Sequence, residues 1–276
     1  MLFAIQFLTL TATAMVAPVS TPAPEASPTA IPLRSVNIPN DGKWHYSVTP
    51  YVFAPQINGT FQFRVPALAH HAPVIISAHE PLGKYLQHVN GLTMITGEAR
   101  KNNFVAAFDY IWLNISTQKA GLTNVPISGN AGFRVTANIW TAAAGGTIVR
   151  SNNGTMDALL GVRSLNLNTA LNWNLSEPIS VLPQSGTVSK SGTVNDIVAA
   201  IRGKVRLGNH LSLPYYLDGG FGSESSTMQA AGGLAYEESW GNIILTYRAL
   251  IYNANPASLN RRLTFNGLAL GASYKF

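Results

Sequence analysis

The 276-residue sequence contains no cysteine, which excludes disulfide bonds, cysteine–zinc sites and lipid attachment to an N-terminal cysteine. Charged residues make up only 11% of the chain, whereas about a quarter of the residues in typical soluble domains are charged. After the N-terminal segment no run of about 18 apolar residues occurs, so we expect no membrane-spanning helix in the mature chain. The net charge of +6 comes from scattered residues rather than from a basic cluster, which argues against nucleic acid as a partner. A glycine-rich chain of this kind is typical of a barrel whose outer face meets lipid.

The end of the chain, residues 263–276, has the clearest pattern. From Asn266 onward, apolar side chains alternate with small or polar ones, and a strand places successive side chains on opposite faces. The pattern predicts the closing strand of an outer-membrane β-barrel, with an apolar face toward lipid and aromatic residues at the interface. We expect Tyr274 and Phe276 to form the signal that the barrel assembly machinery recognises. The apolar face holds Leu268, Leu270, Ala272, Tyr274 and Phe276, and the other face holds Gly267, Ala269, Gly271, Ser273 and Lys275.

The N-terminal part divides into two segments before the barrel. Residues 1–17 are apolar and end in small residues, which predicts a secretory signal peptide, although no Lys or Arg precedes Arg34. A buried N-terminal strand is the alternative. Residues 18–42 are rich in proline, which predicts an extended periplasmic linker. The barrel itself is expected over residues 43–276.

Strand-like segments within the barrel fall into hairpins with tight turns, separated by longer links. The predicted hairpin strands are residues 92–101 with 104–116, 132–149 with 155–173, 194–207 with 211–221, and 227–238 with 242–252. Longer links are expected at 117–130, 174–192, 222–226 and 253–262, and a long loop at 67–90, with a short helix at 81–89 as an option. Alternation of short periplasmic turns with longer outer loops is typical of outer-membrane barrels.

Strand number depends on residues 44–65. If they form one strand with a bulge, the final strand ends in the periplasm and the barrel has ten strands. If Asn58-Gly59 forms a hairpin turn, twelve strands become the better count, and eight is a further alternative. A secreted β-sandwich would also alternate, but its strands usually have about 5–6 residues, and these runs are longer.

Several motifs stand out along the barrel. They are WHYSVTPYVFAPQINGTF from Trp44, an Asp157, Gly161, Arg163 pattern, and Asp196 with Arg202. A further one is the block Asp218-Gly219-Gly220-Phe221-Gly222, with Ser225, Gln229 and the Tyr247-Arg248 pair. Together they resemble motifs of a group of proteobacterial outer-membrane β-barrel proteins of poorly defined function. Phe53 stands where the group has Trp, and a His- and Pro-rich stretch at 67–89 replaces an acidic, helix-forming segment. The resemblance implies a fold and a location, and it supplies no activity.

Ten charged residues fall on the predicted inward faces. One interpretation is a narrow aqueous path with a mild preference for anions. The other is that they pair as a ladder that fills the lumen and fixes strand register, because buried charges are normally paired. The ten residues are Glu98, Arg100, Asp157, Arg163, Asp196, Arg202, Lys204, Arg206, Asp218 and Arg248.

Evidence for catalysis or metal binding is weak. The chain has no G-x-S-x-G, H-E-x-x-H or phosphate-binding loop, and we expect no cofactor and no metal. His70, His71, His79 and His88 gather in the predicted 67–90 loop without the surroundings of a metal site. The segment 218–222 is either a binding loop or a strand end with a bend.

The leading hypothesis is a non-enzymatic outer-membrane barrel, either structural or a narrow passive path for small polar or anionic solutes. Its expected partners are outer-membrane lipid and lipopolysaccharide, the assembly machinery and, if the lumen is open, small solutes. The alternative is an outer-membrane enzyme acting on lipid or peptide, for which His45, His210 and Asp109 are the candidates.

Overall fold

The computed structural model describes residues 40–63, 74–80, 89–117, 122–123, 129–175, 184–223, 225–254 and 262–276. The predicted signal peptide and nearly all of the predicted linker therefore lie outside the described residues. The described part contains no helix long and apolar enough to cross a membrane. Its strands are β1 (His45–Phe63), β2 (Val74–Glu80), β3 (Val89–Lys101), β4 (Phe104–Thr117), β5 (Leu122–Thr123), β6 (Gly129–Ser151), β7 (Gly154–Leu175), β8 (Ser185–Arg206), β9 (Leu211–Phe221), β10 (Ser225–Glu237), β11 (Gly241–Ala254) and β12 (Leu263–Lys275).

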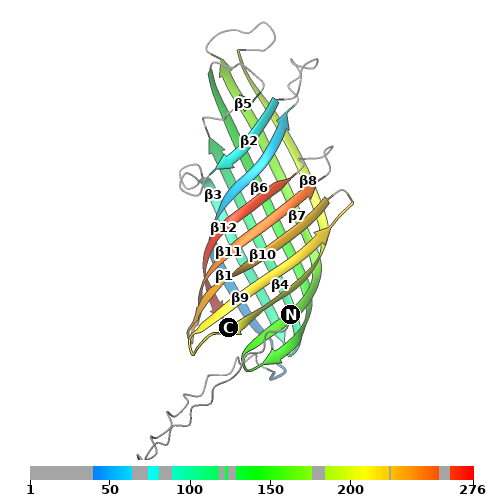
Figure 1. Cartoon of the computed structure of the whole chain (residues 1–276), viewed down its shortest axis with the longest axis vertical. Helices are drawn as coiled ribbons and strands as arrows, with labels where there is room; N and C mark the ends of the chain where they lie inside the picture. The colour runs from blue at the N-terminus through cyan, green and yellow to red at the C-terminus, as the bar shows by residue number, and fades with distance from the viewer. Residues whose placement is uncertain are drawn as a thin grey trace, which may run out of the picture. The chain divides into compact units, whose positions relative to one another are not determined.

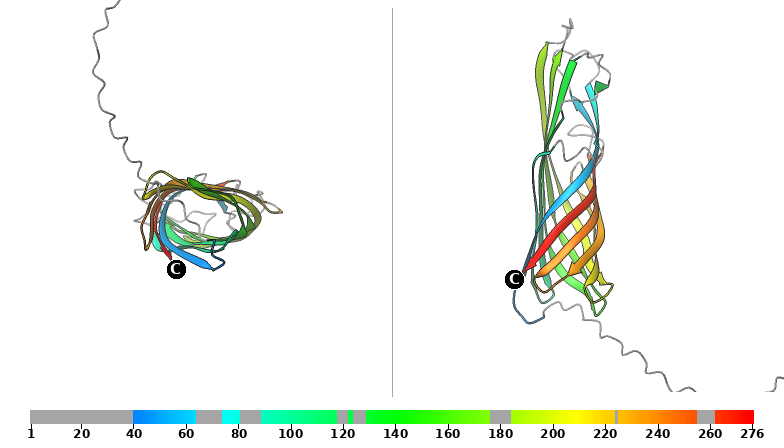
Figure 2. Two further views of the ribbon diagram at one scale, coloured as in Figure 1. Left: turned by 90° about the horizontal axis from the view of Figure 1, so that it is seen from below. Right: turned by 90° about the vertical axis from the view of Figure 1, so that its left-hand side faces the viewer.

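Ten of these strands close into an antiparallel barrel (Figure 1). Each long strand pairs with the next one along the chain, and β12 returns to pair with β1, which closes the ring seen in the left view of Figure 2. The short strands β2 and β5 extend the sheet beside the far end of β1. The predicted ten-stranded barrel is confirmed, and the sandwich alternative is excluded because a sandwich does not close on itself.

The barrel has two distinct ends. Tight turns after β3, β6, β8 and β10 and the C-terminal Phe276 lie at one end, which we call the turn end (Figure 1). At the opposite, loop end, β6, β7 and β8 continue beyond their neighbours (Figure 2, right). Pairing of β7 with β8 runs to Asn174–Ser185, whereas pairing of β8 with β9 stops at Ile197–Phe221. These strands have 22 or 23 residues, against the about 9–11 that a tilted membrane strand needs.

The segment that decided strand number is one strand, β1, without the predicted bulge. Its register with β12 runs from Ser47–Lys275 to Gly59–Leu263 with no shift. The Asn58-Gly59 hairpin is therefore wrong as well, because both residues lie within this ladder. Register shifts occur instead between Val89 and Gly91 of β3 and between Thr147 and Val149 of β6.

Pro55 fits inside β1 because its ring nitrogen faces a side without a strand partner. Pairing with β3 ends at Pro50, and pairing with β2 begins at Ile57. Tyr46 exchanges backbone hydrogen bonds with Phe276 of the neighbouring chain end. The N–H and C=O groups of even-numbered residues of β1 therefore point toward β12, and those of odd-numbered residues such as Pro55 point away from it. Proline lacks a backbone N–H and is tolerated where no ladder bond is required. In the same gap the backbone N–H of Phe53 donates to the Met94 sulfur at 3.1 Å.

Four of the predicted connections require correction. The predicted 67–90 loop contains strand β2, and the predicted link at 117–130 contains strand β5. Residues 81–88, where a helix was an option, lie outside the described residues. The predicted link at 174–192 is mostly strand, since β7 continues to Leu175 and β8 begins at Ser185. The link at 222–226 is short, because the N–H of Gly222 donates to the carbonyl of Ser225 at 2.9 Å and β10 starts there. Cross-strand bonding thus extends strands into segments whose polar composition resembled loops.

The outward face of the barrel carries an apolar band bounded by aromatic residues at the turn end. Large apolar side chains such as Leu160, Ile197 and Leu270 are exposed on it. Tyr46 stacks on both Trp44 and Phe276 around the rim, with ring centroids 6.2 and 6.1 Å apart. Such a band with an aromatic girdle is the lipid-facing surface of outer-membrane barrels. The exposed aromatic residues at this rim are Trp44, Tyr46, Phe104, Tyr236, Trp240, Tyr274 and Phe276.

Candidate functional site

The barrel interior is the candidate site, and it has a polar half toward the turn end and an apolar half toward the loop end. Inward side chains come from the odd-numbered residues of β1, β4, β6, β7, β10 and β12 and the even-numbered ones of β3, β8, β9 and β11. Two polar networks and one further ion pair cross the polar half between strands that are not neighbours in the sheet.

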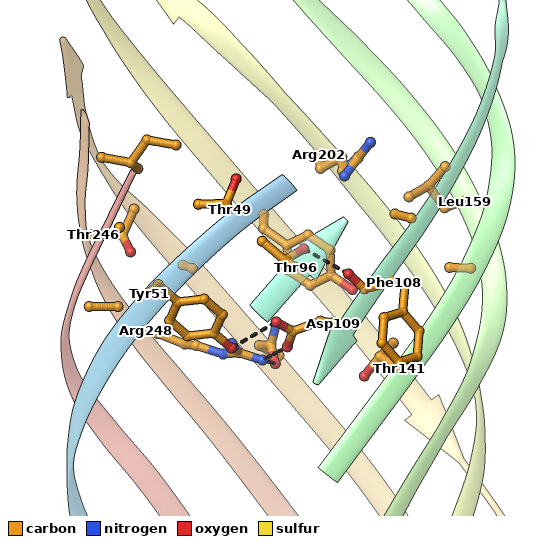
Figure 3. Close-up of a pocket in the computed structure, with 18 residues that line it drawn as sticks. Thr49, Tyr51, Thr96, Phe108, Asp109, Thr141, Leu159, Arg202, Thr246 and Arg248 are labelled. Carbon is orange, nitrogen blue, oxygen red and sulfur yellow. Dashed lines mark hydrogen bonds and ion pairs between the residues drawn. The ribbon is translucent and has the colours of Figure 1, made fainter. Parts of the chain in front are cut away.

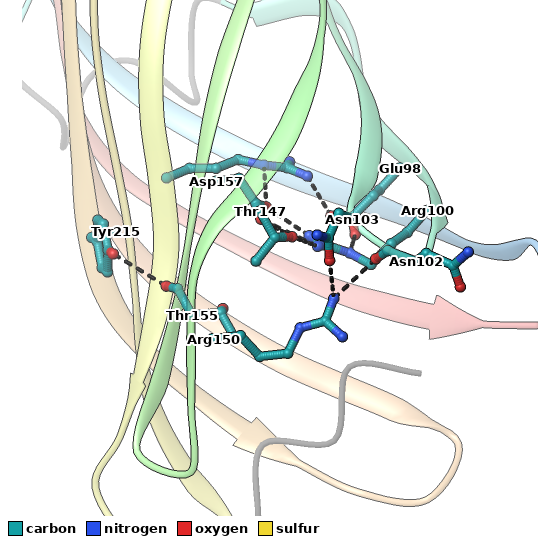
Figure 4. A network of polar contacts seen from close by, with 10 residues as sticks. Glu98, Arg100, Asn102, Asn103, Thr147, Arg150, Thr155, Asp157 and Tyr215 are labelled. Atoms are coloured by element: carbon teal, nitrogen blue, oxygen red, sulfur yellow. Dashed lines mark hydrogen bonds and ion pairs between the residues drawn. The ribbon is translucent and has the colours of Figure 1, made fainter. Parts of the chain in front are cut away.

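The first network lies nearest the turn end (Figure 4). Arg100 of β3 binds Asp157 of β7 through both terminal nitrogens, at 2.6 and 3.2 Å, and donates from Nε to Glu98 at 2.9 Å. Arg202 of β8 reaches across to Glu98 at 2.6 Å. Thr147 of β6 donates to Asp157 at 2.8 Å and accepts from Arg100 at 2.7 Å. The positive charges of two guanidinium groups are thus balanced by the negative charges of two carboxylates.

The second network lies deeper in the lumen (Figure 3). Arg248 of β11 pairs with Asp109 of β4 at 2.5 Å and donates to the hydroxyl of Tyr51 at 3.0 Å. Tyr51 in turn donates to Asp109 at 2.7 Å, and Arg248 also donates to Gln229 of β10 at 2.8 Å. Strands from opposite parts of the barrel wall therefore meet through side chains in the lumen.

The further ion pair, outside the two networks, joins Arg163 of β7 to Asp218 of β9. Arg163 is 1% exposed and binds both carboxylate oxygens of Asp218, while its Nε donates to Thr141 at 3.0 Å. A longer contact of 3.5 Å to Gln229 connects this pair to the second network. The charges are paired and bonded, as buried charges must be if their desolvation is to be offset.

A cavity of about 220 Å³ lies between the first two networks, with Arg202 and Arg248 both on its wall (Figure 3). It exists because much of the wall at this level is Ala, Gly and Thr, whose side chains are too short to meet across the lumen. A water molecule occupies about 30 Å³ of liquid, so the volume corresponds to several waters or one small molecule. The small residues on its wall include Thr49, Thr96, Ala107, Ala143, Ala231, Thr246 and Gly271.

The loop-end half of the lumen is filled by apolar side chains. Phe53, Leu113 and Leu250 are each 2% exposed or less and belong to one continuous buried cluster. The Phe53 ring lies 5.7 Å from the guanidinium carbon of Arg248, which joins this cluster to the second polar network. Close packing of this kind leaves little room for an aqueous path. Other members are Ile57, Met94, Ile111, Phe133, Leu165, Leu167, Leu171, Trp173 and Phe265.

The remaining predicted lumen residues lie at the edges of these layers. Lys204 pairs with Glu237 at 2.7 Å near the turn end, where Ser212 donates to the same carboxylate. Arg206 shares the face of Lys204 at the end of β8. Asp196 is buried near the loop between β9 and β10 and accepts from Ser225 at 2.5 Å.

The Asp218–Gly222 segment is the end of β9 and the turn that follows it. Asp218 points inward to Arg163, and Phe221 is exposed on the outward face. A Cβ on Gly222 would lie 2.3 Å from the carbonyl oxygen of Asn195, so only glycine fits at this close approach. The structure thus places Gly222 at a close approach to the backbone of β8, whereas a Cβ on Gly219 would lie in open space.

Sequence reasoning identified one of the four members of the second network, Arg248, as a lumen residue. Tyr51, Asp109 and Gln229 were not among the predicted lumen residues, and neither were Thr147 and Glu237. The residues around Asp109 are apolar on both faces of β4. Alternation of polar and apolar residues therefore did not mark Asp109 as inward-facing. A single carboxylate in an otherwise apolar strand was the available signal, because such a group needs a partner.

The three candidate catalytic residues do not come together. His45 lies at the turn end with its ring 3.0 Å from Asp41, and His210 lies in the β8–β9 turn, 3.0 Å from the carbonyl of Glu237. Asp109 is in the lumen, bonded to Tyr51 and Arg248. No group of three or more His, Asp or Glu side chains suited to a metal ion occurs within the described ranges. His70, His71 and His88 lie outside them.

Comparison with solved structures supports the fold. The outer membrane protease OmpT from Escherichia coli matches with a TM-score of 0.50 at 8% identity, over 87% of this chain and 99% of that one. The toluene transporter TodX from P. putida matches at 0.33, with 11% identity over 85% and 90% of the two chains. The translocator domain of the autotransporter NalP from Neisseria meningitidis matches at 0.27, with 12% identity over 86% and 90%. No protein-family model and no curated protein sequence matches the chain.

The likeness to OmpT supports the fold and assigns no family. The chain is a closed, antiparallel, ten-stranded β-barrel of the kind found in outer-membrane proteins. At 8% identity the match to OmpT concerns the fold alone. The scores for TodX and NalP are too low to carry an argument. The likeness to the group suggested by the sequence motifs stays a resemblance.

Proposed function

We propose that this protein is a structural component of the outer membrane whose barrel is closed to solutes. The observation that carries the proposal is the filling of the lumen at successive levels. Arg100–Asp157 and Arg248–Asp109 bridge the polar half from wall to wall, and the buried cluster around Phe53 fills the half beyond it. A path along the barrel axis would have to break both ion-pair levels and open the apolar packing.

Charge balance weighs against the alternative of an anion path. Arg100 and Arg202 face Glu98 and Asp157, and the other two buried arginines each have one carboxylate. An anion entering these levels would meet guanidinium groups that are already neutralised. Selective pores instead present charge that the solute can use.

The outward surface supports the location. The apolar band with its aromatic rim suits a barrel embedded in lipid. Pairing of β12 with β1 closes the ring, and a closed ring removes the free sheet edges that lipid does not tolerate, apart from the stretch of β1 between Pro50 and Ile57 that lacks a strand partner on one side. Tyr274 and Phe276 are both exposed on this surface at the turn end, where assembly factors can reach them. Their role as an assembly signal is part of the proposal.

Single-channel recording of the refolded protein in planar bilayers tests the closed lumen. Folding is verified first by heat-modifiable migration in SDS gels. We expect a heat-modifiable protein that produces no conductance steps. Steps in the unmodified protein whose anion preference disappears in the Arg202→Ala/Lys204→Ala/Arg206→Ala triple variant would overturn the closed barrel in favour of a cation-lined path.

A loosened variant sharpens the test. Asp109→Ala with Arg248→Ala removes both partners of the central ion pair without leaving an unpaired charge, and Phe53→Ala removes the side chain that stacks on it. We expect this triple variant to stay silent while the Arg100–Asp157 level is intact, and to pass ions once Arg100→Ala and Asp157→Ala are added, if the protein folds. The matched control is Leu160→Ala, which truncates a lipid-facing side chain and should leave the barrel silent.

A further inference from the structure

The outward face of β7 and β8 changes composition at one rung of the sheet. On the turn-end side of the Ser164–Asn195 pair it carries exposed apolar side chains, including Leu160 and Val162 of β7 and Ile197 of β8. On the loop-end side every outward residue but Ala170 carries an amide or hydroxyl. Asn166, Asn168, Asn172 and Asn174 lie on β7, and Ser185, Thr187, Ser189, Ser191 and Thr193 lie on β8. We call these nine polar residues the Asn/Thr face.

Both strands of this face contain a six-residue repeat. Ser-Gly-Thr-Val occurs at 185–188 and again at 191–194, and Asn-X-Asn occurs at 166–168 and again at 172–174. Six is an even number, so both copies of each repeat present the same residues on the same side of the sheet.

The register brings the repeats of the two strands together. Asn166 lies opposite Thr193 and Asn172 lies opposite Thr187. Two residues further toward the loop end, Asn168 lies opposite Ser191 and Asn174 lies opposite Ser185. Each repeat unit thus consists of one Asn–Thr pair and the Asn–Ser pair beside it. The face therefore holds two equivalent groups of four side chains, about 20 Å apart along the strands at about 3.3 Å per residue.

Hydrogen bonds within the face orient its amides. The hydroxyl of Thr193 donates to Oδ1 of Asn166 at 2.7 Å, and that of Thr187 donates to Oδ1 of Asn172 at 2.8 Å. These bonds use the amide oxygens and leave the amide N–H groups for a ligand. Asn168, Asn172 and Asn174 are exposed, as are all five β8 members. The donors are thus held in a fixed, repeated arrangement before any ligand binds.

The chemistry of the face selects a saccharide. It has no charged member, whereas nucleic acid is bound mainly through cations that contact its phosphates. It also lacks the aromatic and apolar centre that protein interfaces concentrate, and it offers no apolar side chains to acyl chains. Repeated amides and hydroxyls instead match a repeating polymer of hydroxyl groups.

We propose that the Asn/Thr face binds the saccharide part of lipopolysaccharide. The face begins on the same two strands where the apolar band ends, which is the height at which sugars of the outer leaflet stand next to the barrel. This inference rests on the proposed outer-membrane location. It goes beyond the partner expected from the sequence by assigning the contact to the sugars and to named residues.

Titration calorimetry of the refolded full chain in detergent tests the proposal with three probes: lipopolysaccharide with complete core sugars, free core oligosaccharide and lipid A. The test variant is Asn166→Ala/Asn172→Ala, which removes the oriented amide of each unit. The control variant is Asn152→Ala/Asn153→Ala, in the exposed turn between β6 and β7 at the opposite end of β7. Heat-modifiable migration shows that each variant is folded.

We expect the protein to bind the lipopolysaccharide and the free oligosaccharide, and the test variant to bind both about tenfold or more weakly, because two hydrogen-bonding groups are lost. The control variant should bind like the unmodified protein. Equal affinity for lipid A alone, no binding of the oligosaccharide, or the same loss in the control would each overturn the proposal. Silent bilayer recordings would leave the closed barrel intact in all three cases, so the two proposals fail separately.

Discussion

The two halves of the lumen are closed by different physical means on the same set of strands. In the turn-end half, charged side chains such as Arg100 and Arg163 meet partners from strands that are not their neighbours, and each of these two guanidinium groups has a carboxylate. In the loop-end half, side chains such as Leu113 and Leu165 fill the space through contact alone. A charge in a dry interior needs a specific partner, whereas an apolar side chain needs only a matching shape.

The comparison shows how each half determines the shape of the barrel. Strand register constrains only neighbours in the sheet. The ion pairs connect strands that are not neighbours: β3 with β7, β7 with β9, and β4 with β11. The ion pairs therefore set distances between strands across the lumen. The apolar half packs against the β4–β11 pair, because Phe53 contacts Arg248.

The largest expected effect is loss of one partner of the most buried pair. Arg163→Ala leaves the Asp218 carboxylate buried and unpaired, and we expect a loss of about 3–5 kcal/mol in the free energy of unfolding. Urea unfolding of the refolded protein in lipid or detergent measures it. The double variant Arg163→Met/Asp218→Leu, which removes both charges, should lose clearly less. If the single and double variants unfold alike, pairing of charge does not govern the polar half.

In the apolar half, a cavity should be less costly than an unpaired charge. Leu113→Ala removes a side chain that is 2% exposed, and we expect a loss of about 3 kcal/mol in the same unfolding measurement. Leu113→Met keeps the volume and should cost less than about 1.5 kcal/mol. Equal losses for Ala and Met would mean that this half is not closely packed.

At the rim of the polar half, the same kind of ion pair should matter much less. Lys204 and Glu237 form a pair whose side chains are 27% and 19% exposed, so solvent screens it. We expect Lys204→Ala to cost about 1 kcal/mol or less, and the difference from the unmodified protein to shrink in about 1 M salt. An effect as large as that of Arg163→Ala would show that burial does not separate the two pairs.

The smallest effect lies outside the barrel wall, at Asp41. A hydrogen bond from His45, followed by the backbone N–H of Lys43, lowers the pKa of the Asp41 carboxyl in the folded protein. A lowered folded pKa means that this carboxylate adds stability above the pKa of the unfolded chain, and the contribution disappears as pH falls through the lower folded value. In an NMR titration, His45→Ala should raise the pKa of Asp41 toward its ordinary value. An unchanged titration would remove the role assigned to the ring.

Much of this architecture follows from local pattern. Alternation in residues 263–276 identified the closing strand and its lipid-facing side, and the tight turns placed four hairpins. Period-two alternation is a property of each strand by itself, so it can be read without knowing the neighbours. The ten predicted lumen charges were found in the same way, and those on β8 share one face of that strand.

Contacts across the lumen depend on the closed barrel. The carboxylate that pairs with Arg248 depends on the number of strands, on their tilt and on which residue of β4 faces the lumen at that level. The sequence of β11 contains no information on any of these. The filled loop-end half escaped sequence reasoning for a related reason. An inward Leu113 or Leu165 looks the same in sequence as a lipid-facing leucine, because an apolar side chain is buried equally well by lipid and by protein. Ring closure, which only the folded chain establishes, decides between the two and so decides whether the barrel is open.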